Sequence, residues 1–468
     1  MFEYKDEYYE IQKMNNQLIN SQRALTKTNQ RLKQALADIR SANDTIALLE
    51  QDELTGLFRV SAFYRKVKWR RVQAPEQLFD IIVLNIEHFS LVNELFGRKA
   101  SEQLVRSLAL FLTGLEHAED GIIARSSGDV FYLYMPVVLG KERFYDQMEK
   151  KLPEFFNAYP LPIHLSGRIG VYTGGEEEIP VEQMCDRARL ALDTVGKQDD
   201  GKIAFYTREL HEKLLMEHRI LDSVQDALEN GEYKLYLQPK VDMAKDGEMV
   251  GAEALIRWIS PEMGFIPPDK FIPLLEKEGR IYPVDQYIWE EACKFLHERK
   301  VRGMKPVTVS VNLARADLYQ PDLLDVLTGL LKKYDLKPQE LNLEIIERDY
   351  TGDSEHMFEI LGKLRNTGFT IEMDDFGVGE SSLAMAAEMP VDVLKLDRQF
   401  LVANLHSERH VAVIRLILNL AKTLGMKVIA EGVETKEQAD LLLSLGCHYA
   451  QGYLYGKPEP AQKFLEQK

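Results

Sequence analysis

The stretch FTIEMDDFGVG, residues 369–379, decides the fold of the largest segment of this 468-residue chain. It has the pattern of a buried β-strand that ends in two adjacent aspartates, Asp374 and Asp375. Side chains alternate along a strand, so both carboxylates can face one site only where the strand breaks into a loop. Gly377 and Gly379, directly afterwards, predict such a break. The stretch therefore predicts a core strand that leads into a polar site.

Strand-like runs of the same kind recur on both sides of this stretch, with helical patterns between them. Eight runs over roughly 230 residues predict a barrel of the eight-stranded α/β kind. The runs are KLYLQPKV, VGAEALIRW, VTVSVNLA, LNLEIIE, FTIEMDDF, VLKLD, KVIAEGVE and YAQGYLYG.

Polar residues lie at the expected ends of these strands. This is notable because the inward-facing residues of barrel strands are expected to be apolar. The set comprises Glu253, Asn312, Glu344, Glu347, Asp374, Asp375 and Glu431. Chemistry in such barrels sits at the carboxyl ends of the strands, where these residues would converge. For most single acids a strand cap or an ion-pair partner is the better explanation, but for the set of seven it is improbable.

Several carboxylates at one mouth repel each other unless a cation neutralises them. Oxygen ligands without Cys or His indicate hard cations such as Mg²⁺ or Mn²⁺. Asp374 could bridge two ions about 3.5–4 Å apart, the spacing of two-metal phosphodiester hydrolysis. Lys395, in VLKLD, supplies a cation that can orient a water molecule or meet a phosphate.

These residues closely resemble the EAL domain, the family that hydrolyses the bacterial second messenger cyclic di-GMP. The resemblance covers about residues 215–465 and includes Glu253-Ala254-Leu255 itself. Further motifs follow in the family's order: YLQPKVD, VSVNLA, LEIIE, DDFGVGESSL, LKLD, AEGVE and QGYLYGKP.

The resemblance implies a role for each matching residue. Two Mg²⁺ or Mn²⁺ ions would be held by Glu253, Asn312, Glu344, Asp374, Asp375 and Glu431. Glu253, Lys395 and Glu431 would be catalytic, with Lys395 orienting the water and Glu431 at the position proposed as general base. The dinucleotide would be bound by Gln238, Leu255, Arg257 and Gln451. Glu347 would stabilise the loop that follows the two aspartates.

From Asp52 to about Thr207 strands and helices alternate in a different order. FDIIVLNIEHF predicts a strand that runs into a helix over 89–115, followed by a hairpin made of IARSS and VFYLY. A helix near 141–156, the strand HLSGRIGVYT, the helix VEQMCDRARLALDTV and the strand KIAFYT complete the pattern. Mixed strand pairing with helices on one face predicts an α+β sandwich.

This segment resembles a GGDEF domain, the family that makes cyclic di-GMP from two GTP molecules, over about residues 50–206. DELTGL, LNIEHFSLVNELFG, SGRIGV and CDRARLAL carry the resemblance. The signature itself reads Ser127-Gly128-Asp129-Val130-Phe131, with Val130 in place of a metal-binding acid. Asn85 replaces the other metal-binding aspartate and Ser90 a phosphate-contacting lysine, while Asn93 keeps the guanine-contacting position.

Loss of both acids leaves little to neutralise a triphosphate or to lower the pKa of a 3′-hydroxyl. No cyclase activity is expected of this palm-like domain. GTP binding through Asn93 and a purely structural role both remain open.

Residues 8–49 lack Gly and Pro and show a heptad repeat, with Leu18, Leu25, Leu32, Ile39 and Ile46 seven residues apart. The companion row is weaker: Met14, Ser21, Thr28, Ala35, Ala42 and Leu49. This pattern favours a two-stranded coiled coil and therefore a homodimer, against a lone amphipathic helix packed on its own chain.

The segments are then a coiled-coil signalling helix at 1–50, a degenerate GGDEF domain at 51–206, a linker helix at 207–230 and an EAL domain at 231–468. The whole chain is a multidomain α/β protein, with a (β/α)8-like barrel in its last segment.

Charge and composition narrow the function further. With 58 Lys and Arg against 74 Asp and Glu, the net charge of −16 argues against DNA or RNA as a partner. Cys185, Cys293 and Cys447 form no CxxC pair and are expected as buried fillers in a reducing cytosol. No run approaches the roughly 20 apolar residues that cross a bilayer, and the start is too polar for a signal peptide. We therefore expect a cytoplasmic protein.

The sequence thus predicts metal-dependent hydrolysis of cyclic di-GMP to linear pGpG. The alternative is a cyclic di-GMP receptor that does not hydrolyse its ligand and signals through dimer rearrangement. A third hypothesis adds regulation, in which GTP at the degenerate domain shifts hydrolysis through the linker helix.

Overall fold

The structure is a computed structural model. It describes residues 14, 21–38, 50–138, 142–174, 179–195, 203–346, 354–376, 388–402 and 407–466. The chain divides into two compact units, residues 1–213 and 214–468, and the division falls within helix α6 (Arg208–Glu229). Residues 21–38 are helical and exposed. No helix among the described residues combines the length and apolar character that a membrane span needs.

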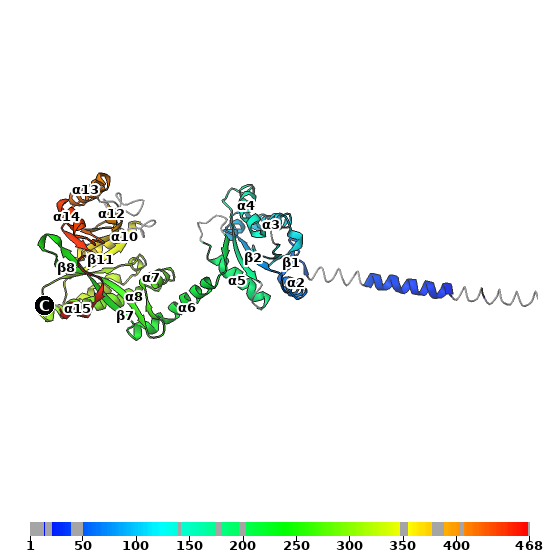
Figure 1. Cartoon of the computed structure of the whole chain (residues 1–468), viewed down its shortest axis with the longest axis horizontal. Helices are drawn as coiled ribbons and strands as arrows, with labels where there is room; N and C mark the ends of the chain where they lie inside the picture. Colours follow the sequence, from blue (N-terminus) through cyan, green and yellow to red (C-terminus); the bar gives the residue numbers. More distant parts are fainter. Residues whose placement is uncertain are drawn as a thin grey trace, which may run out of the picture. The chain divides into compact units, whose positions relative to one another are not determined.

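The first unit is built around a six-stranded mixed sheet (Figure 1). The strand order is β1-β3-β4-β2-β5-β6, antiparallel in the centre and parallel at the β1–β3 and β5–β6 edges. The strands are β1 (Phe58–Arg59), β2 (Phe79–Ile86), β3 (Ile122–Arg125), β4 (Phe131–Pro136), β5 (Gly167–Gly174) and β6 (Ile203–Phe205).

Helices cover both faces of this sheet, so the prediction of helices on one face was wrong. Strand β2 is buried on both sides, because alternate residues point to opposite faces. Ile82 and Leu84 pack against α3 (Phe89–Thr113) and α4 (Phe144–Asn157), whereas Ile81 and Val83 pack against α2 (Val60–Gln73) and α5 (Val181–Asp193). A continuous apolar strand such as FDIIVLNI is typical of a sheet buried on both faces.

The second unit contains a closed eight-stranded barrel, as the sequence predicts. The strand order is β7-β15-β14-β13-β12-β11-β10-β8, and β7 pairs with β8 to close it. Strand β7 runs antiparallel to its barrel neighbours β8 and β15, and every other pair of adjacent barrel strands is parallel. The strands are β7 (Tyr233–Asp242), β8 (Glu248–Ser260), β10 (Thr308–Asn312), β11 (Leu341–Ile346), β12 (Ile371–Phe376), β13 (Val393–Leu396), β14 (Lys427–Ala430) and β15 (Tyr449–Gln451).

Helices surround this barrel, and two short strands extend it (Figure 1). The strands are β9 (Gly264–Ile266), which pairs with β8, and β16 (Glu459–Pro460), which pairs with β7. The helices are α7 (Pro268–Lys277), α8 (Tyr282–Val301), α9 (Leu323–Lys333), α10 (Ser354–Thr367), α12 (Gln399–Val402), α13 (Glu408–Thr423), α14 (Lys436–Ser444) and α15 (Ala461–Glu466).

The apolar core of the second unit lies between strands and helices. Val309, Val311, Leu343 and Ile371 belong to one cluster that also includes Leu327 of α9. The alternate residues of the same strands face the barrel interior and include charged groups that are at most 1% exposed, such as Glu344 and Glu372. Burying charge in this way requires oppositely charged partners, and these define the site described below.

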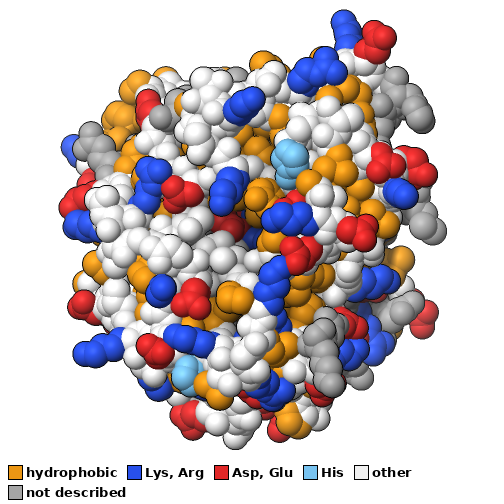
Figure 2. Space-filling view, turned by 90° about the vertical axis from the view of Figure 1, so that its left-hand side faces the viewer, with side chains coloured by type: hydrophobic (Ala, Val, Ile, Leu, Met, Phe, Trp, Pro, Cys, Tyr) orange, Lys and Arg blue, Asp and Glu red, His pale blue; other side chains and the backbone are white. Residues whose placement is uncertain are grey.

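The face of the molecule in Figure 2 carries acidic and basic side chains interspersed, without a continuous region of either sign. All three cysteines are buried and free, as predicted. Burial raises the pKa of the Cys447 thiol to about 11, which keeps it protonated and unreactive at neutral pH.

Candidate active site

The ammonium group of Lys395 lies among carboxylates from separate strands of the barrel. Its Nζ is 2.7 Å from Glu431 Oε1, 3.2 Å from Asp374 Oδ1 and 3.4 Å from Glu253 Oε2, and it also pairs with Glu344. Lys395 is fully buried, and Glu344 is too. The sequence predicted each of these residues for the site, and the structure brings them together.

Asp374 and Asp375 face the site together because β12 is irregular at this point. The pairing of β12 with β13 shifts register between Met373 and Phe376, and Asp375 has a left-handed backbone with φ 57°. Such a bulge turns two consecutive side chains toward one side. The break therefore lies at the aspartates themselves. The glycines predicted to supply it, Gly377 and Gly379, are outside the described residues.

Three carboxylates at this bulge are close enough to share a cation. One oxygen from each of Asp374, Asp375 and Glu431 lies within 4.8 Å of the other two. Glu431 reaches this position because it directly follows β14, where its backbone N–H donates to the Leu396 carbonyl at 2.9 Å. Oxygen donors of this kind suit hard divalent cations.

The electrostatics of the cluster are strongly coupled. Burial and the neighbouring Glu344 charge raise the pKa of Glu253 to about 7. Burial also acts on Glu344, but the Lys395 and Lys240 charges outweigh it and lower its pKa to about 2. Burial disfavours the Lys395 ammonium, yet the surrounding carboxylates raise its pKa well above the ordinary value. The cluster therefore favours a charged lysine that holds carboxylates together.

Two glutamines connect the cluster to the closing strand of the barrel. Gln451 Nε2 donates to Gln238 Oε1 at 3.0 Å and to Glu253 Oε2 at 2.5 Å, while Gln238 Nε2 donates to the Gly456 carbonyl at 3.2 Å. Gln451 Oε1 is buried and has no hydrogen-bond partner among the described residues. An amide held in this way is oriented in advance for a polar ligand.

The other predicted substrate-binding residues lie on the same strand as Glu253. Leu255 and Arg257 stand two and four residues after Glu253 on β8, so the three side chains lie on one face of the strand. Both are half-buried, and the Arg257 guanidinium lies 5.6 Å from the centre of the Tyr236 ring. Asn312 ends β10 in register with Glu344. Glu347, predicted to stabilise the following loop, is outside the described residues.

Sequence reasoning missed two charged residues of this interior. Lys240 Nζ donates to Glu372 Oε2 at 2.5 Å and to Ser310 Oγ at 2.7 Å, and it lies 3.4 Å from Glu344 Oε2. Both charged residues stand two positions from predicted site residues, Lys240 from Gln238 and Glu372 from Asp374. The two-residue period of a strand was the signal that could have placed them in the interior.

The hairpin between β3 and β4 turns at Gly128 and Asp129. Gly128 has φ +60°, and the Ser126 N–H donates to the Val130 carbonyl at 2.9 Å. Asp129 Oδ2 accepts from the Ile86 N–H at 3.0 Å, so this acid ties the hairpin to β2. Burial raises the pKa of Asp129. Its described contacts are those of a structural acid.

The two replaced metal positions carry no acid in the structure. Asn85 Oδ1 is buried and finds no hydrogen-bond partner in the part of the chain that the structure describes, and Val130 packs against an apolar cluster of the sheet. Ser90 and Asn93 are exposed near the start of α3, where Asn93 Oδ1 accepts from Ser101 Oγ at 3.3 Å. This arrangement leaves Asn93 accessible at the surface.

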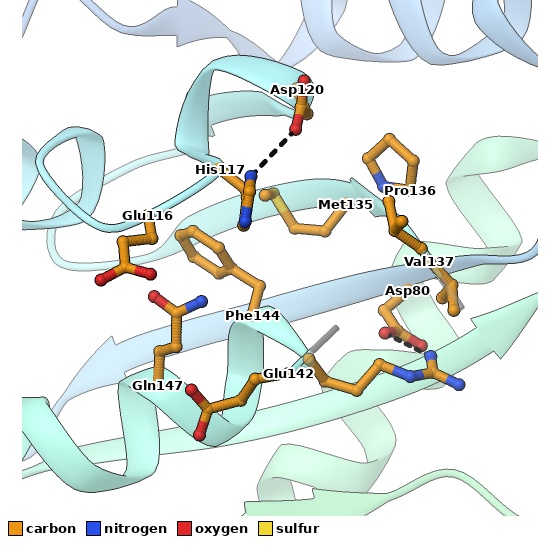
Figure 3. Close-up of a pocket in the computed structure, with 12 residues that line it drawn as sticks. Asp80, Glu116, His117, Asp120, Met135, Pro136, Val137, Glu142, Phe144 and Gln147 are labelled. Carbon is orange, nitrogen blue, oxygen red and sulfur yellow. Dashed lines mark hydrogen bonds and ion pairs between the residues drawn. The ribbon is translucent and has the colours of Figure 1, made fainter. Parts of the chain in front are cut away.

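A small cavity of about 30 Å³ lies elsewhere in the first unit (Figure 3). His117 pairs with Asp120 on one side of it and Arg143 with the buried Asp80 on the other, at 3.4 and 2.8 Å. Gln147 Oε1 is buried without a partner among the lining residues. The volume is that of about one water molecule and is too small for a nucleotide.

Fold and site together define a class: an eight-stranded α/β barrel whose interior holds a carboxylate cluster suited to divalent cations. The chain belongs to the EAL domain family, whose model matches residues 221–458. The model described as diguanylate cyclase, GGDEF domain, matches residues 49–202, so the two domains stand in tandem.

Curated relatives share both parts of the chain. The bifunctional diguanylate cyclase/cyclic di-GMP phosphodiesterase MucR of Pseudomonas aeruginosa is 29% identical over 430 residues, covering 91% of this chain. The cyclic di-GMP phosphodiesterase NbdA of the same organism is 30% identical over 389 residues, covering 81%. The chain spans only 62% and 48% of the lengths of these two relatives.

Solved structures confirm the fold. The EAL enzyme Bd1971, in its form bound to cAMP and cyclic di-GMP, matches with a TM-score of 0.52 at 23% identity. The match covers 84% of this chain and 95% of that one.

Proposed function

We propose that the second unit hydrolyses cyclic di-GMP to linear pGpG with two divalent cations, Mg²⁺ or Mn²⁺. The observation that carries the proposal is the buried cluster of Glu253, Glu344, Asp374 and Glu431 around Lys395. The EAL family and the names of the two relatives support the same substrate.

The charge of the barrel interior fits two such ions. Its connected carboxylates are Glu253, Glu344, Glu372, Asp374, Asp375 and Glu431, and its ammonium groups are Lys240 and Lys395. Six carboxylates against two ammonium groups leave four negative charges, which two divalent cations would neutralise. Burial, together with the neighbouring Glu344 charge, raises the pKa of Glu253, and divalent cations would favour its ionised form.

Each residue has a chemical task in this proposal. The six predicted ligands, Glu253, Asn312, Glu344, Asp374, Asp375 and Glu431, would hold the cations, which supply a nucleophile at neutral pH and stabilise charge on the phosphate. Lys395 would position the attacking water and offset the charge that develops on the phosphodiester. Glu431, 2.7 Å from Lys395, would take up the proton of that water.

The substrate would be held by residues that do not carry the chemistry. Gln238 and Gln451 would orient it through their amides, and Arg257 would pair with a phosphate. Leu255, on the same face of β8, would pack against the nucleotide. Substitution of Arg257 should therefore raise KM more than it lowers kcat.

The test is turnover of cyclic di-GMP by the purified full chain with Mg²⁺ or Mn²⁺. We expect release of linear product that stops when EDTA is added and in the Glu253→Ala variant. Tight calorimetric binding with unchanged nucleotide recovered afterwards, under both metals and at several protein concentrations, would instead favour the receptor alternative.

We further propose that the first unit is not a cyclase, because Asn85 and Val130 occupy the positions of the two metal-binding acids. Its role is structural or that of a GTP sensor acting through α6. The sensor requires a different affinity for GTP in two states of the protein. Hydrolysis rates measured with and without GTP decide between the roles: an unchanged rate and no GTP binding would leave the structural role.

A further inference from the structure

Beneath the candidate active site, Lys240 contacts a carboxylate that the proposed function assigns to metal binding. Lys240 points into the barrel from β7 and is 2% exposed. Its ammonium group lies 3.4 Å from Glu344 Oε2, while Lys395 pairs with the other oxygen of the same carboxylate, Oε1. Glu344 is therefore held between two ammonium groups, one on each oxygen.

Lys240 is itself fixed in place by three neighbouring groups. Glu372 Oε2 and Ser310 Oγ accept from its Nζ, and Glu372 Oε1 accepts from Asn342 Nδ2 at 2.7 Å. Ser310 and Asn342 are buried, at 0% and 7% exposure. A side chain with this many partners has little freedom to move, so it can hold Glu344 in one orientation.

We propose that Lys240, held by Glu372, is a positioning residue for the metal ligand Glu344. By engaging Oε2 it directs Oε1 toward Asp374, Glu431 and Lys395. This inference rests on the proposed function, because it takes Glu344 as a ligand. The competing explanation is structural: Lys240 is present only to neutralise the buried Glu372.

Lys240 lies away from the substrate-binding mouth, so its replacement removes no contact assigned to the substrate. It lines a cavity of about 410 Å³ whose other lining residues include Thr308, Asn342, Val393 and Tyr449. These stand at or near the amino ends of their strands, opposite the carboxyl ends where active sites of such barrels lie. Water in a cavity of this size can also solvate groups that a substitution leaves exposed.

The test compares two variants with a matched control. Lys240→Met removes the ion pair between Lys240 and Glu372 and leaves the Glu372 carboxylate without its cation. Lys240→Met/Glu372→Gln removes both charges. The double variant is used for the test if the single variant does not fold. Lys245→Met is the control: its Nζ pairs with Asp242 at 3.2 Å and it lines the same cavity. No described contact joins Lys245 to Glu344.

Two quantities are measured on the full chain without nucleotide: Mn²⁺ affinity by calorimetry, and the midpoint of thermal unfolding without metal. We expect the double variant to unfold close to the wild-type midpoint yet to bind Mn²⁺ about 10–100-fold more weakly, the usual effect of losing a group that orients a ligand. The control should match wild type in both quantities.

The outcomes separate this inference from the proposed function. If the double variant binds Mn²⁺ as tightly as wild type, Lys240 is structural and the positioning role is wrong, while metal-dependent hydrolysis stands. If wild type binds neither Mn²⁺ nor, in the same measurement, Mg²⁺, the proposed function falls and the positioning role falls with it. A variant that loses Mn²⁺ affinity only in proportion to a lowered unfolding midpoint also contradicts positioning.

Discussion

The ammonium group of Lys395 contacts carboxylates on β8, β11 and β12 and the one that follows β14. Lys395→Met removes every one of these contacts. Glu344 keeps Lys240 and Glu253 keeps Gln451, but Asp374 and Glu431 lose their described cationic partner. We expect a loss of roughly 3–5 kcal/mol in the free energy of unfolding without metal, as for other broken buried pairs.

Urea unfolding with and without Mn²⁺ measures this loss, and part of it should be recovered with the metal. Lys463→Met is the control, since it breaks an exposed, solvent-screened pair with Glu459 that contributes little to stability. Equal losses in the two variants would contradict the described role of Lys395.

A second prediction concerns Asp317, which is fully buried beside Asp285. Burial raises the pKa of Asp317 to about 6 from its ordinary 3.8. The folded state thus binds a proton more tightly than the unfolded state. Its contribution to stability is complete below pH 3.8 and is lost as pH rises through about 6.

The change that Asp317→Asn makes to the free energy of unfolding should therefore be more favourable at pH 8 than at pH 4, by roughly 1–3 kcal/mol. The asparagine Oδ1 can still accept from the Ala314 N–H, as Asp317 Oδ2 does at 2.8 Å. Urea unfolding at the two pH values measures the difference. Asp325→Asn, exposed on α9, should show none, and a stabilisation that is the same at both pH values would refute the assignment.

Residues with a proposed catalytic or metal-binding role could be predicted from the sequence. Residues that only position other residues were harder to predict. Glu253, Asp374 and Lys395 follow from acids and lysine at expected strand ends. Lys240 and Glu372 were not predicted from the sequence, because a charged residue within a strand pattern more often lies on the solvent-exposed face of the strand. Their two-residue spacing from Gln238 and Asp374 was the available signal, and closure of the barrel shows that this side of each strand is interior.

At the scale of elements, the bulge in β12 makes the site possible. Asp375 adopts φ 57°, a conformation that costs most side chains about 1–2 kcal/mol and glycine very little. We expect the Asp375→Gly variant to be about 1 kcal/mol more stable than the Asp375→Ala variant in its free energy of unfolding. Both variants should lose hydrolysis, because each lacks a proposed metal ligand.

Thermal or urea unfolding of the two variants, with turnover assays alongside, checks both halves of this prediction. Equal stability of the two variants would mean that position 375 is not left-handed in solution. Full activity in either variant would remove Asp375 from the ligand set.

The periodicity of the sequence predicted which segments are strands and which are helices. It predicted only part of how these elements are arranged. All eight barrel strands lie where alternation and apolar runs predict them. The antiparallel direction of β7 was not predicted, since strand patterns carry no direction. Helices on both faces of the first sheet were missed, although the continuous apolar run of FDIIVLNI already indicated burial on both sides.

At the scale of the whole molecule, we expect the N-terminal helix to set the oligomeric state. Within the described part of this helix, Leu25 and Leu32 are 63% and 58% exposed, and they are seven residues apart. A second copy of the helix would bury them in a coiled-coil seam.

Deletion of residues 1–49 should therefore lower the dimer fraction in sedimentation equilibrium. Leu25→Asn/Leu32→Asn should act in the same direction, whereas Thr26→Asn/Lys33→Asn, one position further along the helix, should not. An unchanged dimer fraction after the deletion would place the dimer contact elsewhere or show that none exists.

Hydrolysis of cyclic di-GMP by the barrel can be followed through the oxygen atom that enters the product. The full chain is incubated with cyclic di-GMP and Mn²⁺ in ¹⁸O-labelled water, and the nucleotides are analysed by mass spectrometry. Attack of water on phosphorus breaks the P–O3′ bond, so we expect pGpG with one ¹⁸O atom on its 5′-phosphate, and none from Glu253→Ala. Recovery of only unlabelled, intact cyclic di-GMP from the wild-type protein would contradict the account.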